Sequence, residues 1–485
     1  MTPVSELIAV RHTDLYIDGE WRPASDGQRI EVQDPASGEV ITTVASASVK
    51  DALDAVQAAH QALRQWASRA PRERAEILRR AFDLVLKEKE KLAELMTREN
   101  GKTLTESRGE VAYAAEFFRW FSEEAVRNIG SVSISPSGAN RILVEHQPIG
   151  VSVLVTPWNF PAAMATRKIG PALAAGCTIV LKPASETPLS ALAVTGLLEQ
   201  AGVPKGVVNV IPSKRSSEVV KAMLKDPRVR KLSFTGSTEV GRLLLAQAAE
   251  HVISCSMELG GNAPFLVLAD ADLDAALEGA LVAKMRNNGQ SCIAANRFYV
   301  DAKVAEQFAG ALAKAMGDMP VGPGLDQNTR VGPVINEAAR HKMSGLVDEA
   351  QKDGARVLTG GKAPSRPGYF YLPTVLTDVP PDEQILNEEI FGPVAPIVPF
   401  RDITEAIEFA NRTDRGLASY VFTRDLATGL AVAEAIEAGM VGVNRGFISD
   451  PAAPFGGVKQ SGLGREGAHD GLLEFLETKY IATTW

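Results

Sequence analysis

The chain has 485 residues, 45% hydrophobic and 23% charged, a composition typical of a soluble globular protein with two or three domains. Its formal charge of -8, without a run of lysine or arginine, argues against a nucleic-acid partner or an anionic membrane surface. The segment "MTPVSELIAVRHTDLY" lacks the apolar core of a signal peptide, and no stretch of about 20 residues is apolar enough to span a bilayer, so we expect no membrane association.

Residues 1 to about 140 begin with a turn-rich segment and continue into helices. The segments at 50–67 and 74–96 repeat apolar residues at three- and four-residue spacing, which predicts amphipathic helices. From Gly150 the pattern changes to short β-branched runs that alternate with helical stretches. Strands are predicted at 151–155, 178–182, 207–211 and 231–235, with helices at 162–176, 190–202, 216–224 and 239–250.

A second series of this kind follows from about residue 262. Its predicted strands are 264–268, 297–301, 355–360, 371–379, 418–423 and 440–444. Alternation of strand and helix is typical of a parallel, doubly wound sheet, so we expect an α/β protein with two such domains facing each other across a cleft. The segments at 131–150 and at the C-terminus belong to neither series and read as strands that pair with each other or with another subunit.

The expected domain division follows from these series. We assign residues 1–130 and 151–256 to a dinucleotide-binding domain and residues 257–445 to a catalytic domain. Residues 131–150 and 460–485 are assigned to oligomerisation strands.

The cysteines indicate the redox environment of the protein, and the cysteines and histidines together indicate whether a metal site is expected. Cys177, Cys255 and Cys292 are too few, and odd in number, for a disulfide framework, which fits a reducing cytoplasm. The six histidines are scattered and none pairs with a cysteine at ligand spacing, so no metal site is expected.

Several polar residues in loops are candidates for chemistry, each with a plainer alternative. Cys292, in "MRNNGQSCIAANR", is either a nucleophile or a small apolar loop residue. Glu258, in "MELGG", is a general base if burial raises its pKa, or simply a glutamate at the end of a helix or strand. Asn159, between Pro157 and Pro161, is an oxyanion donor or a turn residue. The "TGSTEVG" segment, with Gly236 and Ser237, is a phosphate-binding turn or an ordinary one.

Taken together, these segments resemble the aldehyde dehydrogenase superfamily. The motifs "TPWNFP", "LKPASETP", "FTGSTEVG", "MELGGNAP", "GQSC", "EEIFGPV" and "PFGGVKQSGLGREG" occur in that family's order and approximate spacing. The resemblance implies that Cys292 attacks an aldehyde, that Asn159 and the Cys292 backbone N–H hold the oxyanion, and that hydride passes to a nicotinamide. Glu258 would then activate water to hydrolyse the thioester.

The resemblance also implies a cofactor site. Lys182 matches a lysine that reaches the adenosine ribose, and Gly236 and Ser237 match the turn against the pyrophosphate. The remaining expected cofactor residues are Thr156, Pro157, Trp158, Glu389 and Phe391. Ser185 stands where many NAD-preferring relatives have a glutamate, which removes a charge that would repel a 2′-phosphate, and Lys214 and Arg215 would add positive charge nearby. We therefore expect NADP, with NAD as a possible alternative cofactor.

Within the superfamily, the chain most resembles succinate-semialdehyde dehydrogenases. Arg167, Arg286 and Ser449 match the residues that bind the distal carboxylate of the substrate in that group. Asp450 is an unexpected acid beside Ser449, and Arg445 occupies a loop position that is more often small or acidic. Ile293 and Ala294 follow Cys292, so we expect no disulfide switch with a neighbouring thiol.

Other functions remain open at this point. They are a glutarate-semialdehyde dehydrogenase, a broader aldehyde dehydrogenase, a non-catalytic family member, and a cysteine hydrolase without cofactor, which would need a histidine base. The resemblance implies a homodimer or a homotetramer. Glu466, in "GREG", matches a glutamate with either a proton-relay role or a capping or salt-bridge role.

Overall fold

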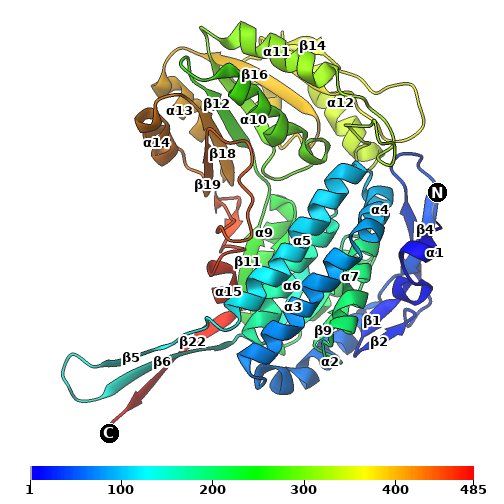
Figure 1. Cartoon of the computed structure of the whole chain (residues 1–485), viewed down its shortest axis with the longest axis vertical. Coiled ribbons are helices and arrows are strands. Elements are labelled where there is room, and N and C mark those ends of the chain that lie inside the picture. Colours follow the sequence, from blue (N-terminus) through cyan, green and yellow to red (C-terminus); the bar gives the residue numbers. More distant parts are fainter. Residues whose placement is uncertain (1–2) are drawn as a thin grey trace.

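Residues 3–485 are described by a computed structural model, in which two large sheets occupy separate halves of the molecule (Figure 1). The first sheet has the strand order β2 (Glu20–Arg22), β1 (Leu15–Ile17), β9 (Val208–Val210), β8 (Thr178–Lys182), β7 (Val151–Val155), β10 (Val229–Thr235), β11 (Ser254–Glu258) and β21 (Gly462–Leu463). The strands from β9 to β11 are parallel, while β1 and β21 run antiparallel at the two sides.

Helices cover both faces of this first sheet. One face packs on α2 (Val49–Ala67), α8 (Ser216–Leu224) and α9 (Thr238–Ala248), and the other on α3 (Pro71–Lys87), α6 (Pro161–Ala175) and α7 (Pro188–Ala201). Neighbouring residues of β8 point to opposite faces of the sheet. Ile179 and Leu181 pack in the core with α3, α6 and α7, and Val180 packs in the core with α2, α8 and α9. Both faces are therefore buried, which explains the continuous apolar runs of these strands.

Two further helices lie over α6 and α7. They are α4 (Lys89–Asn100) and α5 (Leu104–Glu124). The single helix expected at 74–96 is two helices, because the backbone departs from helical geometry at Glu88. Thr103 caps α5 by accepting the backbone N–H of Glu106.

The second sheet has the strand order β14 (Arg356–Thr359), β15 (Thr374–Thr377), β16 (Val394–Phe400), β13 (Ala295–Asp301), β12 (Ala263–Val267), β18 (Ala418–Phe422) and β19 (Met440–Val443). All neighbouring pairs are parallel except β14 with β15. The accompanying helices are α10 (Leu273–Met285), α11 (Ala305–Gly317), α12 (Glu337–Lys352), α13 (Ile403–Asn411) and α14 (Leu426–Ala435). The boundary expected at residue 257 falls inside β11, and the chain passes to the second sheet through residues 259–262.

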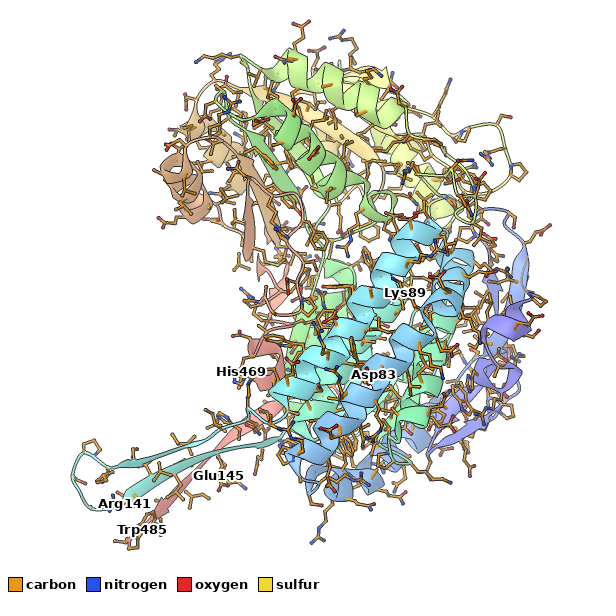
Figure 2. All side chains as sticks on the ribbon, viewed as in Figure 1. Asp83, Lys89, Arg141, Glu145, His469 and Trp485 are labelled. Atoms are coloured by element: carbon orange, nitrogen blue, oxygen red, sulfur yellow. The ribbon has the colours of Figure 1, made fainter. Side chains whose placement is uncertain are left out.

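A three-stranded arm projects from the body, with the C-terminus at its far end (Figure 1). It consists of β22 (Leu476–Thr483), β6 (Arg141–Pro148) and β5 (Ser131–Ile134), all antiparallel. Arg141 and Trp485 lie toward its tip (Figure 2), where the guanidinium stacks on the indole ring at 5.4 Å. The expected C-terminal segment 460–485 was too broad, because β21 joins the first sheet and α15 (Asp470–Leu473) packs against α6.

The N-terminal segment, expected to be turn-rich, also contains regular structure. Besides β1 and β2 it has α1 (Val4–Leu7) and a hairpin of β3 (Arg29–Gln33) and β4 (Val40–Ala45). A short pair, β17 (Arg415–Gly416) with β20 (Val458–Lys459), completes the strands described for residues 3–485. No helix within that range is both long and apolar enough to cross a membrane.

Candidate active site

Most of the expected site residues gather at one edge of the first sheet. Asn159 follows β7, Lys182 ends β8, Gly236 follows β10 and Glu258 ends β11. These four strands are parallel neighbours, so their carboxyl ends lie at the same edge. This is the edge at which open α/β sheets bind ligands.

Cys292 lies between a tight turn and β13, and its side chain is partly exposed. Three successive residues before it adopt left-handed backbone geometry: Asn287 and Asn288 have φ of 51° and 56°, and Gly289 has φ of 77°. Asparagine and glycine tolerate this region better than other residues, which explains the "NNG" sequence. The turn directs the chain from α10 into the cysteine loop.

The turn is held in place from several directions. A carboxylate oxygen of Glu106 accepts the Asn287 backbone N–H at 2.6 Å. The Asn288 side chain donates to the carbonyl of Pro333 at 3.0 Å and accepts the N–H of Gly332 at 2.9 Å. These contacts fix the backbone that leads to Cys292.

Asn159 lies close to the same turn. Its side-chain Nδ2 donates to the carbonyl of Gln290 at 3.2 Å, and its own carbonyl accepts from Lys102 Nζ at 2.7 Å and from Asn287 Nδ2 at 2.8 Å. The Asn159 side-chain amide therefore contacts Gln290, which lies two positions before Cys292 in the sequence. The hydrogen bonds to the Asn159 carbonyl hold this residue in place. A donor fixed in this way can stabilise an oxyanion formed at the cysteine.

Glu258 is buried, and neither of its carboxylate oxygens has a hydrogen-bond partner among the described residues. Burial raises its pKa well above the ordinary value, and the nearby carboxylate of Glu466 raises it further. Arg167 and Lys168 oppose this shift. A carboxyl group that has a raised pKa and no hydrogen-bond partner is suited to act as a general base.

The Cys292 thiol has a similar environment. Burial raises its pKa to about 12, the carboxylates of Glu389 and Glu258 add to the shift, and Arg167 and Arg286 oppose it. The thiol is therefore protonated at neutral pH in this environment. Its use as a nucleophile requires a base that removes the proton.

A pocket of about 570 Å³ opens beside these groups. It is lined by the ends of β7, β8 and β10 and by residues of α8 and α9. Seven of the expected cofactor residues line it, namely Thr156, Pro157, Trp158, Lys182, Ser185, Gly236 and Ser237.

The residues of this pocket fit a dinucleotide. A Cβ atom at Gly236 would lie 2.4 Å from the ring of Phe234, so only glycine leaves this turn open. Ser237 caps α9, whose N-terminus carries unpaired N–H groups suited to phosphate. Burial lowers the pKa of Lys182 to about 8, and Glu186 opposes this shift. A lysine and a helix N-terminus in one pocket favour an anionic ligand.

The other two expected cofactor residues lie at the border between this pocket and the cysteine. Glu389 accepts the backbone N–H of Gly261 at 3.2 Å, and a Cβ atom at Gly261 would lie 2.0 Å from the carbonyl oxygen of Cys292. The ring of Phe391 packs edge-on against Trp158 with centroids 5.3 Å apart. Both residues therefore border the cysteine loop and the pocket wall.

The charges around Ser185 differ from the expectation. Arg215 is turned away and pairs with Asp26 at 2.5 Å, so it does not add positive charge to the pocket. Lys214 lies in an adjoining groove with Ser185. Glu186 was not predicted from the sequence, and its carboxylate accepts the Ser185 hydroxyl at 3.3 Å.

The three residues expected to bind the substrate carboxylate lie around one tyrosine. Arg167 donates to the hydroxyl of Tyr113 at 2.9 Å, and that hydroxyl lies 2.5 Å from Ser449 Oγ. The Arg286 guanidinium lies 5.7 Å from the Tyr113 ring, 4.6 Å from Phe160 and 4.9 Å from the Phe447 ring. Tyr113 was not predicted from the sequence, because nothing in its helical segment signals a polar partner.

The two arginines are not equivalent. Arg167 is buried, its Nε faces Glu466 at 3.4 Å, and it stacks on Phe455 at 4.0 Å. Arg286 is half-buried, and its guanidinium forms no hydrogen bond or ion pair with any other residue of the described range 3–485. Arg286 is therefore the cation that is available to a ligand.

The two unexpected loop residues do not face this cluster. Asp450 is exposed, and its carboxylate accepts the backbone N–H of Ala452 at 2.9 Å. Arg445 is exposed and donates to the carbonyl of Phe447 at 2.5 Å. The Asp450 carboxylate is therefore bound within its own loop and does not oppose an anion beside Arg286.

Glu466 has a definite buried partner. Its carboxylate accepts from Lys168 Nζ at 2.5 Å, and Lys168 also donates to the Ser233 hydroxyl at 2.9 Å. This contact favours the salt-bridge role over helix capping. Lys168 follows Arg167 directly, and the sequence offered no way to tell their partners apart.

All three cysteines are free. Within the part of the chain that the structure describes, no group of three or more histidine, cysteine or acidic side chains is placed to hold a metal ion.

Comparison with known proteins agrees with this geometry. A model of the aldehyde dehydrogenase family matches residues 21–481. Succinate-semialdehyde dehydrogenase from Paenarthrobacter nicotinovorans is 55% identical over 442 residues, which cover 91% of this chain and 98% of the relative. Glutarate-semialdehyde dehydrogenase from Pseudomonas aeruginosa is 50% identical over 466 residues, 96% of each chain. The crystal structure of an NADP-dependent enzyme from Escherichia coli matches with a TM-score of 0.97 and 48% identity, covering 99% of both chains. The expected α/β fold and the resemblance noted in the sequence are both confirmed, and the chain belongs to the aldehyde dehydrogenase family.

Proposed function

We propose that this enzyme oxidises succinate semialdehyde to succinate and uses NADP as its cofactor. The observation that carries the proposal is Arg286, a half-buried guanidinium without an ion-pair partner in the described range, six positions before Cys292 (292 − 286 = 6). An aldehyde with a carboxylate at its far end would neutralise this charge while its carbonyl reaches the thiol. The relative from Paenarthrobacter nicotinovorans has this activity in its name.

The aromatic rings around Arg286 support this assignment. The guanidinium carbon lies 4.6 Å from the centre of the Phe160 ring and 4.9 Å from that of Phe447, and these cation–π contacts leave its N–H groups available to a ligand. Ser449 adds a hydroxyl close to Tyr113. A carboxylate bound by a guanidinium and a hydroxyl is oriented as well as attracted.

In this proposal Cys292 is the nucleophile. Glu258 accepts the thiol proton, because its buried carboxylate is electrostatically linked to Cys292 and has a raised pKa. The thiolate sulfur attacks the aldehyde carbon and leaves an oxyanion. The Asn159 side-chain amide and the Cys292 backbone N–H donate to this oxygen.

The second half of the reaction is hydrolysis of the thioester on Cys292. After Glu258 has released the thiol proton to solvent, its carboxylate takes a proton from water, the resulting hydroxide adds to the thioester carbonyl, and the acid leaves as the thiolate is released. The unpaired carboxylate oxygens of Glu258 suit this role, since neither is committed to another residue in the described range.

The bound dinucleotide supplies the hydride acceptor. Lys182, Gly236 and Ser237 would hold its ribose and phosphates, and Thr156, Pro157, Trp158, Glu389 and Phe391 would border the remainder. Ser185 supports NADP because it places no charge of its own against a 2′-phosphate, and the Escherichia coli structure is that of an NADP-dependent enzyme. Glu186 lies close enough to weaken this preference, so NAD is expected to be accepted as well.

Glutarate semialdehyde is the second candidate substrate. The Pseudomonas aeruginosa relative carries that name at nearly the same identity. One additional methylene changes binding by only about 1–3 kcal/mol in a fitted pocket, so the same residues would serve both acids.

We further propose how the chain is organised around this site. Residues 1–130 and 151–258 form the dinucleotide-binding domain and residues 259–445 the catalytic domain, so that the boundary expected at 256/257 lies at the end of β11. The arm of β5, β6 and β22 is proposed to pair with a second copy in a homodimer or homotetramer. The three free cysteines support a reducing cytoplasmic location.

The proposal is tested by steady-state kinetics with succinate semialdehyde, glutarate semialdehyde and butyraldehyde, each with NADP and with NAD. The expected result is that succinate semialdehyde with NADP has the highest kcat/KM. The Arg286→Ala variant should lose about tenfold to hundredfold in kcat/KM with both acids and little with butyraldehyde, because only the acids carry the charge.

The Arg445→Ala variant is the matched control, because this arginine is exposed and faces its own loop. It should behave as the wild type. Equal kcat/KM for butyraldehyde and succinate semialdehyde in the wild-type enzyme would contradict the substrate assignment, and a much higher value with NAD would contradict the cofactor assignment.

A further inference from the structure

Tyr113 connects three segments that are far apart in the sequence. It lies in α5, while Arg167 lies in α6 and Ser449 lies in the loop after β19. Its hydroxyl accepts from Arg167 at 2.9 Å and lies 2.5 Å from Ser449 Oγ. The Arg286 guanidinium faces the ring of the same residue. Tyr113 thus touches each of the residues expected to bind the substrate carboxylate.

The chemistry of Arg167 fixes the direction of one hydrogen bond, and the second direction is the one that gives the Tyr113 hydrogen an acceptor. An arginine can only donate, so the Tyr113 oxygen is the acceptor in its contact with Arg167. The hydroxyl hydrogen of Tyr113 then has one acceptor within residues 3–485, the Oγ atom of Ser449. Since Ser449 accepts this bond, its own hydrogen is not used in it.

We infer that Tyr113 is a positioning residue that makes Ser449 a hydrogen-bond donor toward the distal carboxylate of the substrate; this rests on the proposed semialdehyde function. Without Tyr113, Ser449 can turn its hydrogen toward any neighbour and present a lone pair instead. With Tyr113 in place, Ser449 and Arg286 both present hydrogen-bond donors to the ligand. A carboxylate, which accepts only, matches such a site.

The inference also assigns Arg167 an indirect role. Its guanidinium is buried, stacks on Phe455 and faces Glu466. The one strong hydrogen bond that it donates goes to Tyr113. Arg167 therefore acts on the substrate through Tyr113 and Ser449, while Arg286 contacts the carboxylate directly.

This arrangement predicts discrimination against neutral aldehydes. A neutral chain such as that of butyraldehyde leaves the Ser449 hydroxyl and Arg286 without an acceptor. A site built for hydrogen bonding rejects ligands that leave its polar groups unpaired. Tyr113 is thus a determinant of specificity more than of rate.

The test is a double-mutant cycle with Tyr113→Phe, Ser449→Ala and the combination, using succinate semialdehyde and butyraldehyde with NADP. Tyr113→Phe should raise the KM for succinate semialdehyde by about tenfold or more and leave its kcat within about threefold, because binding to a distant carboxylate is lost equally in ground and transition states. Ser449→Ala should have a similar effect alone. In the Tyr113→Phe background it should add less than about threefold, because the two residues act as one unit.

The Tyr480→Phe variant is the matched control. It also removes a tyrosine hydroxyl, but from an exposed residue of the arm. It should leave both substrates unchanged. Unchanged butyraldehyde kinetics in Tyr113→Phe would show that the active site is intact.

Three other outcomes would overturn the inference. If the two substitutions multiply independently, or if Tyr113→Phe leaves the KM for succinate semialdehyde unchanged, Tyr113 does not orient Ser449. If Tyr113→Phe impairs both substrates equally, its role is structural. These results are distinct from failure of the proposed function, which would be seen in the wild-type enzyme as no preference for succinate semialdehyde over butyraldehyde.

Discussion

Glu258 and Cys292 occupy environments that each disfavour a negative charge. Burial raises the pKa of both groups, and the carboxylate of Glu258 raises the pKa of the Cys292 thiol further. The pair therefore favours a state with at most one negative charge. Such coupling suits a site in which one proton passes between thiol, carboxyl group and water.

This coupling predicts the pH dependence of hydrolysis. Only the carboxylate form of Glu258 accepts a proton from water. Because its pKa is raised, the protonated form persists to higher pH than for an ordinary glutamate. The hydrolytic rate should therefore fall as pH decreases through this raised pKa and rise above it.

The Glu258→Gln variant removes the titrating group. Its hydrolytic rate should fall by about a hundredfold or more and lose this pH dependence. Acylation should also slow, because Glu258 is the proposed base for the thiol, but an acyl group that does form on Cys292 should persist and be detected by mass spectrometry. The Cys292→Ala variant, which cannot form the thioester, should show no added mass. An unchanged pH profile in Glu258→Gln would exclude Glu258 as the base.

At this scale, the sequence predicted which residues are candidates but not their partners. Cys292, Asn159 and Glu258 stand in short motifs that can be read without a structure. The contact between Tyr113 and Ser449 joins positions 336 residues apart, and the ion pair of Arg215 with Asp26 joins positions 189 apart. Such pairs depend on tertiary packing and cannot be identified from the sequence. The positive charge expected from Arg215 near the cofactor pocket is therefore neutralised by Asp26 in the structure.

Helix α5 contacts three separate parts of the site. Glu106, Glu110 and Tyr113 follow one another at four- and three-residue spacing and so lie on one side of the helix. Glu106 holds the turn before Cys292, and Glu110 accepts the N–H groups of Ala162 and Ala163 at the start of α6. One helix therefore contacts the nucleophile turn, the helix after Asn159 and the proposed carboxylate site.

Glu106 of α5 is predicted to hold the turn before Cys292 in its position. Left-handed geometry at Asn287 and Asn288 costs about 1 kcal/mol or more per residue, and the hydrogen bond from Asn287 to Glu106 offsets part of this cost. Glu106→Ala should lower kcat by about tenfold with less change in KM, because the loop that carries Cys292 loses its fixed position. Glu106→Gln keeps an acceptor oxygen and should retain most of the activity.

Arg108→Ala is the control on the same helix, since Arg108 pairs with Glu90 at the surface. It should have wild-type kinetics. Equal losses in Glu106→Ala and Glu106→Gln would mean that charge, and not the hydrogen bond to the turn, is what Glu106 provides.

The regular elements were predicted well wherever apolar periodicity was clear. The strands from β7 to β10 and the helices between them were predicted within a few residues. Strand β16 was missed because Pro396 and Pro399 interrupt its apolar run and proline is unusual in a central strand. It nevertheless pairs with β15 and β13 on its two sides, where burial of Val394, Ile397 and Val398 stabilises it.

At the scale of the whole molecule, the two sheets enclose the site and the arm lies outside it. The arm has no large core of its own, and β5 is exposed along its full length. Val132 and Ile134, which point to the same side of β5, are 68% and 57% exposed. An isolated sheet of this kind, with apolar side chains and a free edge, is suited to pairing with another chain.

A second copy of this chain is the proposed occupant, so disrupting β5 should produce monomers. The Val132→Asp/Ile134→Asp double variant places two charges on the exposed side of the strand, and burying them against a partner without counter-charges costs several kcal/mol. Sedimentation velocity should show a shift from dimer or tetramer to monomer. The Leu426→Asp/Leu430→Asp variant is matched, because it changes two residues of α14 that are 62% and 50% exposed, and it should keep the wild-type assembly. Since the arm lies away from Cys292, monomers should still bind NADP, and an unchanged sedimentation coefficient in the β5 variant would rule out this strand as the contact between copies.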